Sequence, residues 1–251
     1  MHVINDFIAA ALGVLTLKDS EVETVQSGVL QSGAPKAVIG AGTGLGESYL
    51  TQDSDLEYTA YPSEGGHADF APRTDEEAEM VKFLMRHEGW QQHVSVERVV
   101  SGPGIATIFD FLVAKARVSN PALVERDKNH FRLIDQGEPA LKAKRIAEQA
   151  DKGCEVCTHA LDVFFSAYGA EIGNVLLKFL PQGGLYIGGG IMGKHRHRLK
   201  SKQFIDAITR KGRLTDLARS IPVYFVIPND LCLRGALVEA VRLAKEEQRG
   251  H

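Results

Sequence analysis

Apolar residues recur along the chain in two patterns, short continuous runs and longer stretches with a spacing of three and four residues. The short runs predict buried strands at about 36–39, 48–50, 184–187 and 222–227. The helical spacing predicts helices at about 75–90, 104–117, 159–180 and 234–248. Thr74 and Glu77 have the spacing of a capping box at the start of the first helix, and the polar stretch 118–137 is predicted to be a surface excursion. This alternation of strands and helices predicts an α/β or mixed α+β fold.

Composition and charge narrow the function. The chain has 251 residues, 44% hydrophobic and 24% charged, which is enough for a substantial buried core. Its net charge of -3 draws it neither to nucleic acid nor to anionic lipid, so a small polar ligand is the expected partner. Neither a run long enough for a membrane span nor a signal-peptide pattern is present in the sequence. Three cysteines are too few for a secreted disulfide framework, so the expected compartment is the cytoplasm.

A glycine-rich turn follows the first predicted strand. Its sequence is Gly40-Ala41-Gly42-Thr43-Gly44-Leu45-Gly46. Alternating glycines let backbone N–H groups approach phosphate oxygens, and the Thr43 hydroxyl is an extra donor. The sixth position, where a dinucleotide-binding fingerprint needs glycine, is Leu45, so that interpretation fails. A glycine-rich hairpin without a ligand is the alternative.

A second glycine cluster, Gly188-Gly189-Gly190-Ile191, follows another predicted strand. Its backbone can wrap an adenosine by close approach. From Gly188 the spacing of a P-loop is met through Lys194, but His195 stands where a P-loop needs Ser or Thr for magnesium. One glycine turn for phosphate and one for nucleoside fit a kinase, whereas two tight turns that only end strands are the alternative.

The segment Glu64-Gly65-Gly66-His67 places a carboxylate and an imidazole on either side of two flexible glycines. Both side chains can face one ligand, and vicinal sugar hydroxyls suit an acceptor beside a group that donates or accepts. A metal site would need further ligands, and since only Asp69 is near, no metal site is predicted. An ordinary surface histidine is the alternative for His67.

Asn5 and Asp6 lie between two apolar pairs, just before a helical pattern. One interpretation is that they cap that helix, as Asn and Asp often do. The other is that Asp6 takes a proton from a substrate hydroxyl while Asn5 helps to hold a sugar. The residues alone leave both open.

Two further motifs are predicted to be structural. Cys154 and Cys157 have the spacing of half a zinc site, but no second pair exists, and three residues apart on a helix they share a buried face. The basic run from Lys194 to Lys202 lacks interleaved aromatic residues, so it is predicted to be a solvated surface.

Taken in order, five motifs resemble the bacterial glucokinase family over essentially the whole chain. They are Val3-Ile4-Asn5-Asp6-Phe7, Gly40-Ala41-Gly42-Thr43-Gly44-Leu45-Gly46, Glu64-Gly65-Gly66-His67-Ala68-Asp69-Phe70, Glu97-Arg98-Val99-Val100-Ser101-Gly102-Pro103-Gly104 and Gly188-Gly189-Gly190-Ile191. The resemblance implies an actin-like (ribonuclease H-like) ATPase fold of two domains. It also implies transfer of the γ-phosphoryl group of ATP, with Mg²⁺, to the 6-hydroxyl of glucose.

The resemblance also assigns roles to single residues. Asp6 would be the catalytic base, and the sugar hydroxyls would be held by Asn5, Glu64, His67 and Glu97. The phosphates would be approached by Gly42, Thr43 and Gly44, and the adenosine by Gly188, Gly189, Gly190 and Ile191. The family further favours a homodimer, and it lacks the structural zinc cysteines of the ROK sugar kinases.

The chain departs from the family before Asp6, because it has no Asp-x-Gly-Gly-Thr phosphate loop. Most of the small domain, on the order of a hundred residues, is therefore expected to be missing. Small-domain remnants are expected at 1–17 and 226–251 around a large domain at 18–225. Exposed apolar residues at the ends and weak or absent activity would follow, since phosphoryl transfer depends on positioning. A non-catalytic glucose-binding module and an incomplete reading frame are the alternatives.

Overall fold

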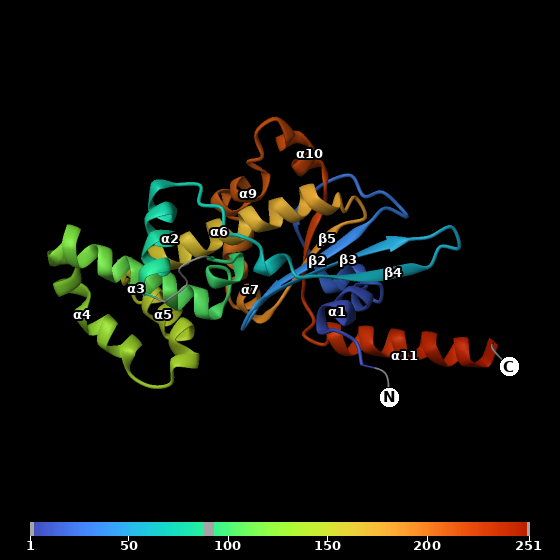
Figure 1. Cartoon of the computed structure of the whole chain (residues 1–251), viewed down its shortest axis with the longest axis horizontal. Coiled ribbons are helices and arrows are strands. Elements are labelled where there is room, and N and C mark those ends of the chain that lie inside the picture. Colours follow the sequence, from blue (N-terminus) through green and yellow to red (C-terminus); the bar gives the residue numbers. More distant parts are fainter. Residues whose placement is uncertain (1–2, 88–92, 250–251) are drawn as a thin grey trace. The chain divides into compact units, whose positions relative to one another are not determined.

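The computed structural model describes residues 3–87 and 93–249, which fall into two compact units. Unit 1 comprises Met1–Ala41, Gly46–Gly65 and Gly169–His251, and unit 2 comprises Gly42–Leu45 and Gly66–Tyr168. The strands in Figure 1 are β1 (Val22–Gln26), β2 (Lys36–Ala41), β3 (Leu45–Gln52), β4 (Tyr58–Ser63), β5 (Leu185–Gly188) and β6 (Val223–Val226). The helices are α1 (Asp6–Val14), α2 (Asp75–His87), α3 (Gly102–Ser119), α4 (Pro121–Asp135), α5 (Lys142–Asp151), α6 (Glu155–Phe179), α7 (Gly190–Lys194), α8 (Arg196–Leu199), α9 (Lys202–Thr209), α10 (Thr215–Ser220) and α11 (Leu231–Arg249). Short 3-10 turns lie at Asp19–Glu21, Gly65–His67, Val96–Arg98, Pro139–Leu141 and Gly212–Leu214.

Unit 1 is built on a mixed sheet with the strand order β1-β6-β5-β2-β3-β4. The central strands β2, β5 and β6 are parallel, and β1 and β4 pair antiparallel at the two edges. Parallel strands are usually covered on both faces, which explains the continuous apolar runs that predicted them. On β3, Tyr49 stacks on Phe179 of α6 with ring centroids 4.6 Å apart, while Leu50 packs in the cluster around α1. Because successive strand residues point to opposite faces, α6 and α1 cover opposite faces of the sheet.

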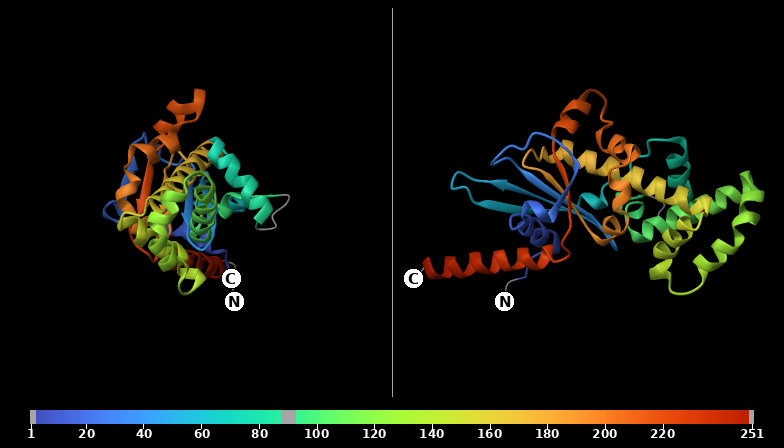
Figure 2. Two further views of the ribbon diagram at one scale, coloured as in Figure 1. Left: turned by 90° about the vertical axis from the view of Figure 1, so that its left-hand side faces the viewer. Right: turned by 180° about the vertical axis from the view of Figure 1, so that it is seen from behind.

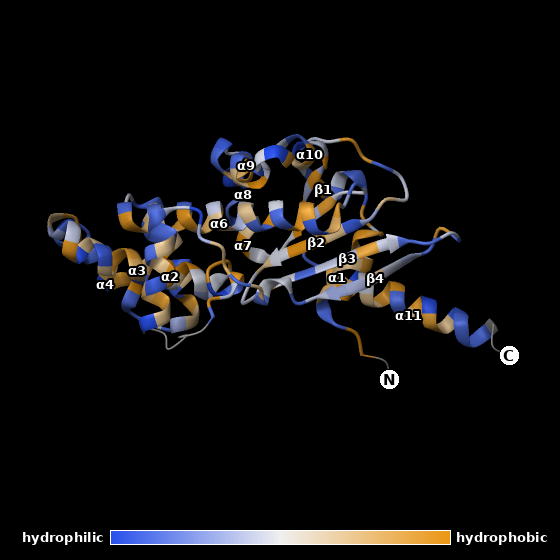
Figure 3. Ribbon diagram, turned by 45° about the horizontal axis from the view of Figure 1, so that its top comes forward, coloured by the Kyte–Doolittle hydropathy of each residue, from blue (hydrophilic) through white to orange (hydrophobic). Residues whose placement is uncertain are grey.

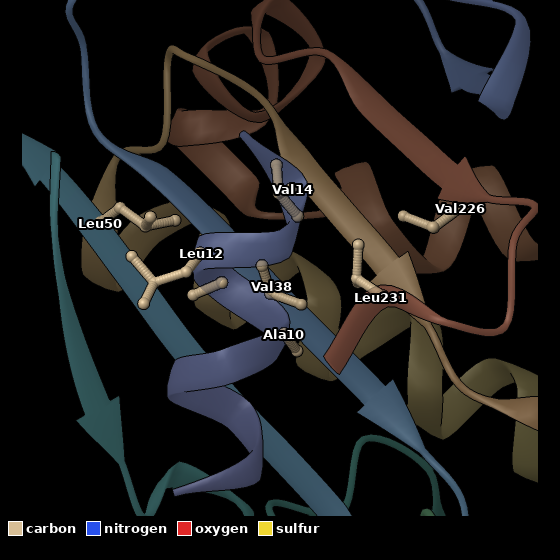
Figure 4. Close-up of a cluster of buried hydrophobic side chains, with 8 residues drawn as sticks. Ala10, Leu12, Val14, Val38, Leu50, Val226 and Leu231 are labelled. Carbon is tan, nitrogen blue, oxygen red and sulfur yellow. The ribbon is translucent and has the colours of Figure 1, made fainter. Parts of the chain in front are cut away.

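The face under α1 holds a compact apolar cluster, shown in Figure 4. Its members, with Ala11 drawn unlabelled, are Ala10, Ala11, Leu12, Val14, Val38, Leu50, Val226 and Leu231. Helices α1 and α11 cross here at two glycines. A Cβ atom on Gly235 would lie 1.7 Å from the carbonyl oxygen of Ala9, and one on Gly13 would lie 2.1 Å from that of Leu231. The two helix backbones are therefore in direct contact.

Helix α11 keeps an apolar stripe in solvent. Leu233, Leu237 and Val241, spaced four residues apart, are 73%, 65% and 46% exposed, and Val3 near the other end of the chain is 77% exposed. Figure 3 shows orange apolar bands alternating with blue along this helix, and the right-hand view in Figure 2 shows it projecting from unit 1. The expected apolar exposure at the ends of the chain is thus present.

Unit 2 is helical, with α3 at its centre. The helix starts where predicted, because Ser101 caps it by accepting the N–H of Gly104 at 3.0 Å. Its buried residues include Ile105, Ile108, Phe109 and Leu112, the stripe that the sequence indicated. Helix α6 begins in this unit and continues into unit 1. Its length and composition would suit a membrane span, but 78% of its apolar window is buried inside the protein, as in a core helix.

The predicted strands and helices are confirmed with shifted ends, except that residues 88–90 of the first helix lie outside the described residues. The capping box at that helix is half formed. Thr74 accepts the N–H of Glu77 at 3.1 Å, but the Glu77 carboxylate accepts the N–H of Arg73 at 2.6 Å instead of that of Thr74. Most of the predicted surface excursion at 118–137 is exposed, as expected, but it forms the helix α4 instead of a loop.

Helix α4 has an ordinary helical design. Asn120 caps it, Pro121 occupies its first position, and Phe131 and Ile134 are buried on one side. Most of the charged residues of this helix are exposed, although Asp127 is buried on the same side as Phe131, and their high density hid the apolar spacing in the sequence.

Candidate active site

Asn5 and Asp6 lie at the N-terminus of α1, and both are exposed. The side-chain oxygen of Asn5 accepts the N–H groups of Phe7 at 2.8 Å and Ile8 at 3.2 Å, so Asn5 is the helix cap. Asp6 is the first helical residue, and one of its oxygens accepts the N–H of Phe7 at 2.9 Å. A helix N-terminus favours negative charge. Asn5, the helix cap, and Asp6, the predicted base, are therefore neighbouring residues at this helix end.

Phe7 fixes this helix end against the sheet. A Cβ atom on Gly46 would lie 1.9 Å from the Phe7 ring, and one on Gly40 would lie 3.1 Å from it. The two outer glycines of the glycine-rich turn thus make room for Phe7, not for a phosphate. The prediction that the glycines of this turn all serve the approach of a ligand is therefore corrected for these two. Because Gly40 and Gly46 have no side chain, the Phe7 ring fits here, and this sets the position of Asp6, the residue just before Phe7.

The inner part of the same turn belongs to unit 2, where Glu97 holds it. One carboxylate oxygen of Glu97 accepts the N–H of Leu45 at 2.9 Å, and it would lie 2.5 Å from a Cβ atom on Gly44. Gly42 accepts the N–H of Gly102 at 2.8 Å. A Cβ atom on Gly42 would meet nothing within 4 Å, and Thr43 is exposed. Of these residues, Gly42 leaves open space beside its Cα while its N–H and carbonyl bond to Gly44 and Gly102, and Thr43 offers its hydroxyl to a ligand.

The segment from His67 to Phe70 lies beside the segment that carries Glu97. Phe70 donates its N–H to the carbonyl of Val94 at 2.8 Å, and Val96 donates to that of Ala68 at 2.9 Å. A Cβ atom on Gly66 would lie 2.2 Å from the carbonyl oxygen of Leu45, so the chain crosses the glycine-rich turn at a glycine. Unit 2 thus brings together three predicted motifs, with His67 exposed and Glu97 half-buried.

Glu64 belongs to unit 1, where it follows β4 and is exposed. The next residue, Gly65, packs on Glu47 of β3, whose carboxylate oxygen would lie 2.0 Å from a Cβ atom there. Glu47 is 1% exposed, and among the described residues neither of its carboxylate oxygens has a hydrogen-bond partner. Burial and, to a smaller extent, the negative charge of Glu171 raise its pKa to about 7, against the opposing positive charge of Lys178. The sequence pointed to this group only by an acidic residue inside an apolar strand, and it was missed.

The buried Glu47 predicts a pH-dependent stability. In the folded protein the Glu47 carboxyl keeps its proton up to about pH 7, whereas the ordinary pKa of a glutamate is 4.5. The contribution of Glu47 to the free energy of unfolding is therefore full below pH 4.5 and falls as the pH rises to 7. Replacement by Gln removes this fall, since the amide stays neutral. Between pH 5 and 8 the free energy of unfolding should drop by about 2 kcal/mol more in the unaltered chain than in Glu47→Gln.

Urea unfolding at a series of pH values measures this difference. Glu57→Gln removes an exposed carboxylate from the same hairpin and is the matched control, which should keep the profile of the unaltered chain. Parallel profiles for Glu47→Gln and the unaltered chain would show that Glu47 does not titrate in this range.

The second glycine cluster joins β5 to α7. Gly189 has a φ of 94°, and a Cβ atom there would lie 2.5 Å from the carbonyl oxygen of Ala41, so this glycine is structural. Cβ atoms on Gly188 and Gly190 would meet nothing within 4 Å, and Ile191 is half-buried. The backbone at Gly188 and Gly190 is thus open to a flat ligand.

The motifs predicted to be structural behave as expected. Cys154 and Cys157 are both fully buried and free of disulfide, as the shared helix face predicted. In the basic run, Arg196 and Lys200 each contact the carboxylate of Glu23, with Lys200 at 2.9 Å, and these hydrogen bonds lower the pKa of Glu23. Both cations are also substantially exposed, as on an ordinary charged surface.

Comparison with known proteins places this arrangement in a family. The model of the family described as glucokinase matches residues 1–243. A glucokinase from Nostoc sp. is 40% identical over 247 residues, covering 97% of this chain and 71% of the relative, and one from Cronobacter sakazakii is 36% identical over 237 residues, covering 67% of the relative. The chain therefore spans about two thirds to seven tenths of these relatives.

Solved structures agree on the fold. The glucokinase from an Antarctic psychrotroph superposes with a TM-score of 0.78 at 30% identity, covering 94% of this chain and 66% of that one. A glucokinase from Balamuthia mandrillaris in complex with glucose gives 0.73 at 19% identity, covering 94% of this chain and 64% of that one. A ROK family glucokinase from Streptomyces griseus, in complex with glucose and AMPPNP, gives 0.53 at 19% identity over 93% of this chain and 66% of that one. The predicted actin-like α/β fold is confirmed, and the chain belongs to the glucokinase family.

Proposed function

We propose that this chain transfers the γ-phosphoryl group of ATP to the 6-hydroxyl of glucose, as an ATP:D-glucose 6-phosphotransferase, with Asp6 as the general base. The observation that carries the proposal is the placement of Asp6. It is an exposed carboxylate at a helix N-terminus, and its neighbour Phe7 is locked against the sheet by Gly40 and Gly46. A base held on a rigid element is what proton transfer in phosphoryl transfer requires.

In this mechanism Asp6 accepts the proton of the glucose 6-hydroxyl while the oxygen of that hydroxyl bonds to the γ-phosphorus. The bond from that phosphorus to the β-phosphate oxygen breaks, and ADP leaves. Asp6 then releases the proton to water. The Asn5 cap uses the amide oxygen, which fixes the orientation of this helix end while the carboxylate acts.

The sugar hydroxyls are proposed to be held by Asn5, Glu64, His67 and Glu97. Glu97 accepts the N–H of Leu45 with one of its oxygens, so its second oxygen is the better acceptor for a sugar hydroxyl. Because of this hydrogen bond, replacement of Glu97 would change the conformation of the glycine-rich turn as well as weaken the binding of the sugar.

ATP is the proposed phosphoryl donor, and the open glycines fit it. Gly42 and Thr43 are proposed to face its phosphates, and Gly188, Gly190 and Ile191 its adenosine, because the space where a side chain would stand on each of these glycines holds no atom within 4 Å. Gly44 and Gly189 have structural roles instead, because a side chain on Gly44 would collide with the Glu97 carboxylate and one on Gly189 with the backbone of Ala41. Mg²⁺ carried on the ATP phosphates would neutralise their charge when bound.

Three further features stay proposals. A large domain at 18–225 with small-domain segments at 1–17 and 226–251 is supported by the exposed apolar stripe of α11. A cytoplasmic location is supported by the free state of Cys154, Cys157 and Cys232. A homodimer rests on the family alone.

A coupled assay of ADP release tests the proposed function. It is run on the 251-residue chain and on the same chain joined to the part of the Nostoc relative that the match leaves uncovered. We expect glucose-dependent ADP release from both, slower from the shorter protein if the added part supplies phosphate contacts. Glu64→Ala and His67→Ala should each raise the KM for glucose by about tenfold, the loss expected for a hydrogen bond of about 1.4 kcal/mol.

No glucose-dependent ADP release from either protein would overturn the proposal. Calorimetry then decides whether the chain is a non-catalytic module. Glucose binding that Glu64→Ala abolishes, without any ATP binding, would identify such a module.

A further inference from the structure

The side chain of His93 contacts two residues of the predicted sugar-binding segment. Its Nδ1 atom lies 2.6 Å from a carboxylate oxygen of Asp69, and its Nε2 atom lies 2.9 Å from the backbone carbonyl oxygen of His67. All three residues belong to unit 2. A single ring thus spans the backbone of His67 and the side chain two positions later.

The two contacts fix the orientation of the ring. A carbonyl oxygen only accepts hydrogen bonds, so Nε2 donates to the backbone of His67. Asp69 contacts the other ring nitrogen, Nδ1, at 2.6 Å and thereby keeps Nε2 turned toward that carbonyl.

The contact with His93 holds the backbone of His67, which the hydrogen bonds between the two segments do not reach. The hydrogen bonds with Val94 and Val96 anchor Phe70 and Ala68, on either side of Asp69. The bond from His93 reaches one residue further, to the backbone that carries the His67 imidazole. The side chains of His93 and Asp69 are 48% and 88% exposed, so neither supports the apolar core.

We propose that His93 is a positioning residue, which holds the backbone of His67 so that its imidazole meets the sugar, with Asp69 orienting the His93 ring. The proposal rests on the proposed function for its consequence, which is the affinity for glucose. Its structural part, the ordering of residues 67–69, stands on the hydrogen bonds alone.

Steady-state kinetics of His93→Phe on the full chain tests the consequence. Phe keeps a ring of similar size and loses both hydrogen bonds. The KM for glucose should rise about tenfold, while kcat changes less than threefold and the KM for ATP stays the same. The single variant Asp69→Asn should keep most of the affinity of the unaltered chain, because an amide can still hydrogen-bond Nδ1 while Nε2 donates to His67.

His159→Phe is the matched control. His159 also lies in unit 2, is about half exposed, and pairs through Nε2 with the carboxylate of Glu76 at 2.7 Å. Its replacement should leave the KM for glucose unchanged. An unchanged KM in His93→Phe would overturn the proposal, as would a loss confined to kcat with a lowered melting temperature, which would indicate fewer folded molecules.

Hydrogen exchange separates this proposal from the proposed function. In His93→Phe the amides of Ala68 and Asp69 should exchange at least tenfold faster than in the unaltered chain, whether or not that chain turns over glucose. If the unaltered chain neither binds nor phosphorylates glucose, the proposed function fails while faster exchange still supports the positioning role. Unchanged exchange overturns it.

Discussion

Replacement of Asp6 by Asn should lower kcat for glucose phosphorylation by about a thousandfold, within the range that a general base contributes. The substituted side chain keeps an oxygen that can accept the N–H of Phe7, as Asp6 does at 2.9 Å, so the helix end should keep its geometry. It cannot take a proton from the 6-hydroxyl. The affinity for glucose should change by less than about threefold, since an amide can still bond a hydroxyl group.

Rapid-quench kinetics together with calorimetry of glucose binding measures the two effects separately. Asp19→Asn removes an exposed carboxylate from a short 3-10 turn of the same unit and should leave kcat unchanged. An Asp6→Asn variant with more than about a tenth of the original kcat would show that another group is the base.

Replacement of Gly235 by Ala should lower the free energy of unfolding by about 2 to 3 kcal/mol, the upper part of the range for an overpacked core. The added Cβ atom would lie 1.7 Å from the carbonyl oxygen of Ala9 and 2.7 Å from the amide nitrogen of Gly13. Both are backbone atoms, so no side chain can rotate away and the two helices must separate. Because α1 carries Asp6, the separation should also reduce kcat by about a hundredfold, as a displacement near 1 Å does.

Urea unfolding and steady-state kinetics measure both consequences. Gly193→Ala is the matched control, because it also places a methyl group on a helix glycine and the nearest heavy atom would be 3.8 Å away. It should change the unfolding free energy by less than about 1 kcal/mol. Equal effects of the two substitutions would mean that the α1–α11 crossing is not the cause.

The sequence predicted the central strands and long helices because their apolar periodicity is strong. Strand β2 and helix α6 are buried over most of their lengths, so tertiary packing and local pattern agree. The edge strands β1 and β4 were not predicted, since each pairs on one side only and mixes polar with apolar residues. Helix α4 was missed because its buried positions are separated by charged residues.

For the candidate site, the motifs gave the residue types but not the reasons for their spacing. The glycine at position 46 is required by the Phe7 ring, which lies 39 positions earlier in the chain, and the one at 44 by the Glu97 carboxylate. Such long-range contacts leave no local signal. The same holds for Glu47 beneath Gly65 and for His93 beside His67, which only the folded chain brings together.

The formation of glucose 6-phosphate is the most direct test of the central claim, that this chain is a glucose kinase with Asp6 as its base. Phosphorus NMR of the unaltered chain with glucose and Mg-ATP follows the product itself over hours, which makes even slow turnover measurable. The account predicts a growing glucose 6-phosphate signal with equal loss of the ATP γ-phosphate, and a signal at least a hundredfold smaller with Asp6→Asn. Glucose 6-phosphate formed at the same rate by Asp6→Asn, or by neither protein while both are folded, would contradict it.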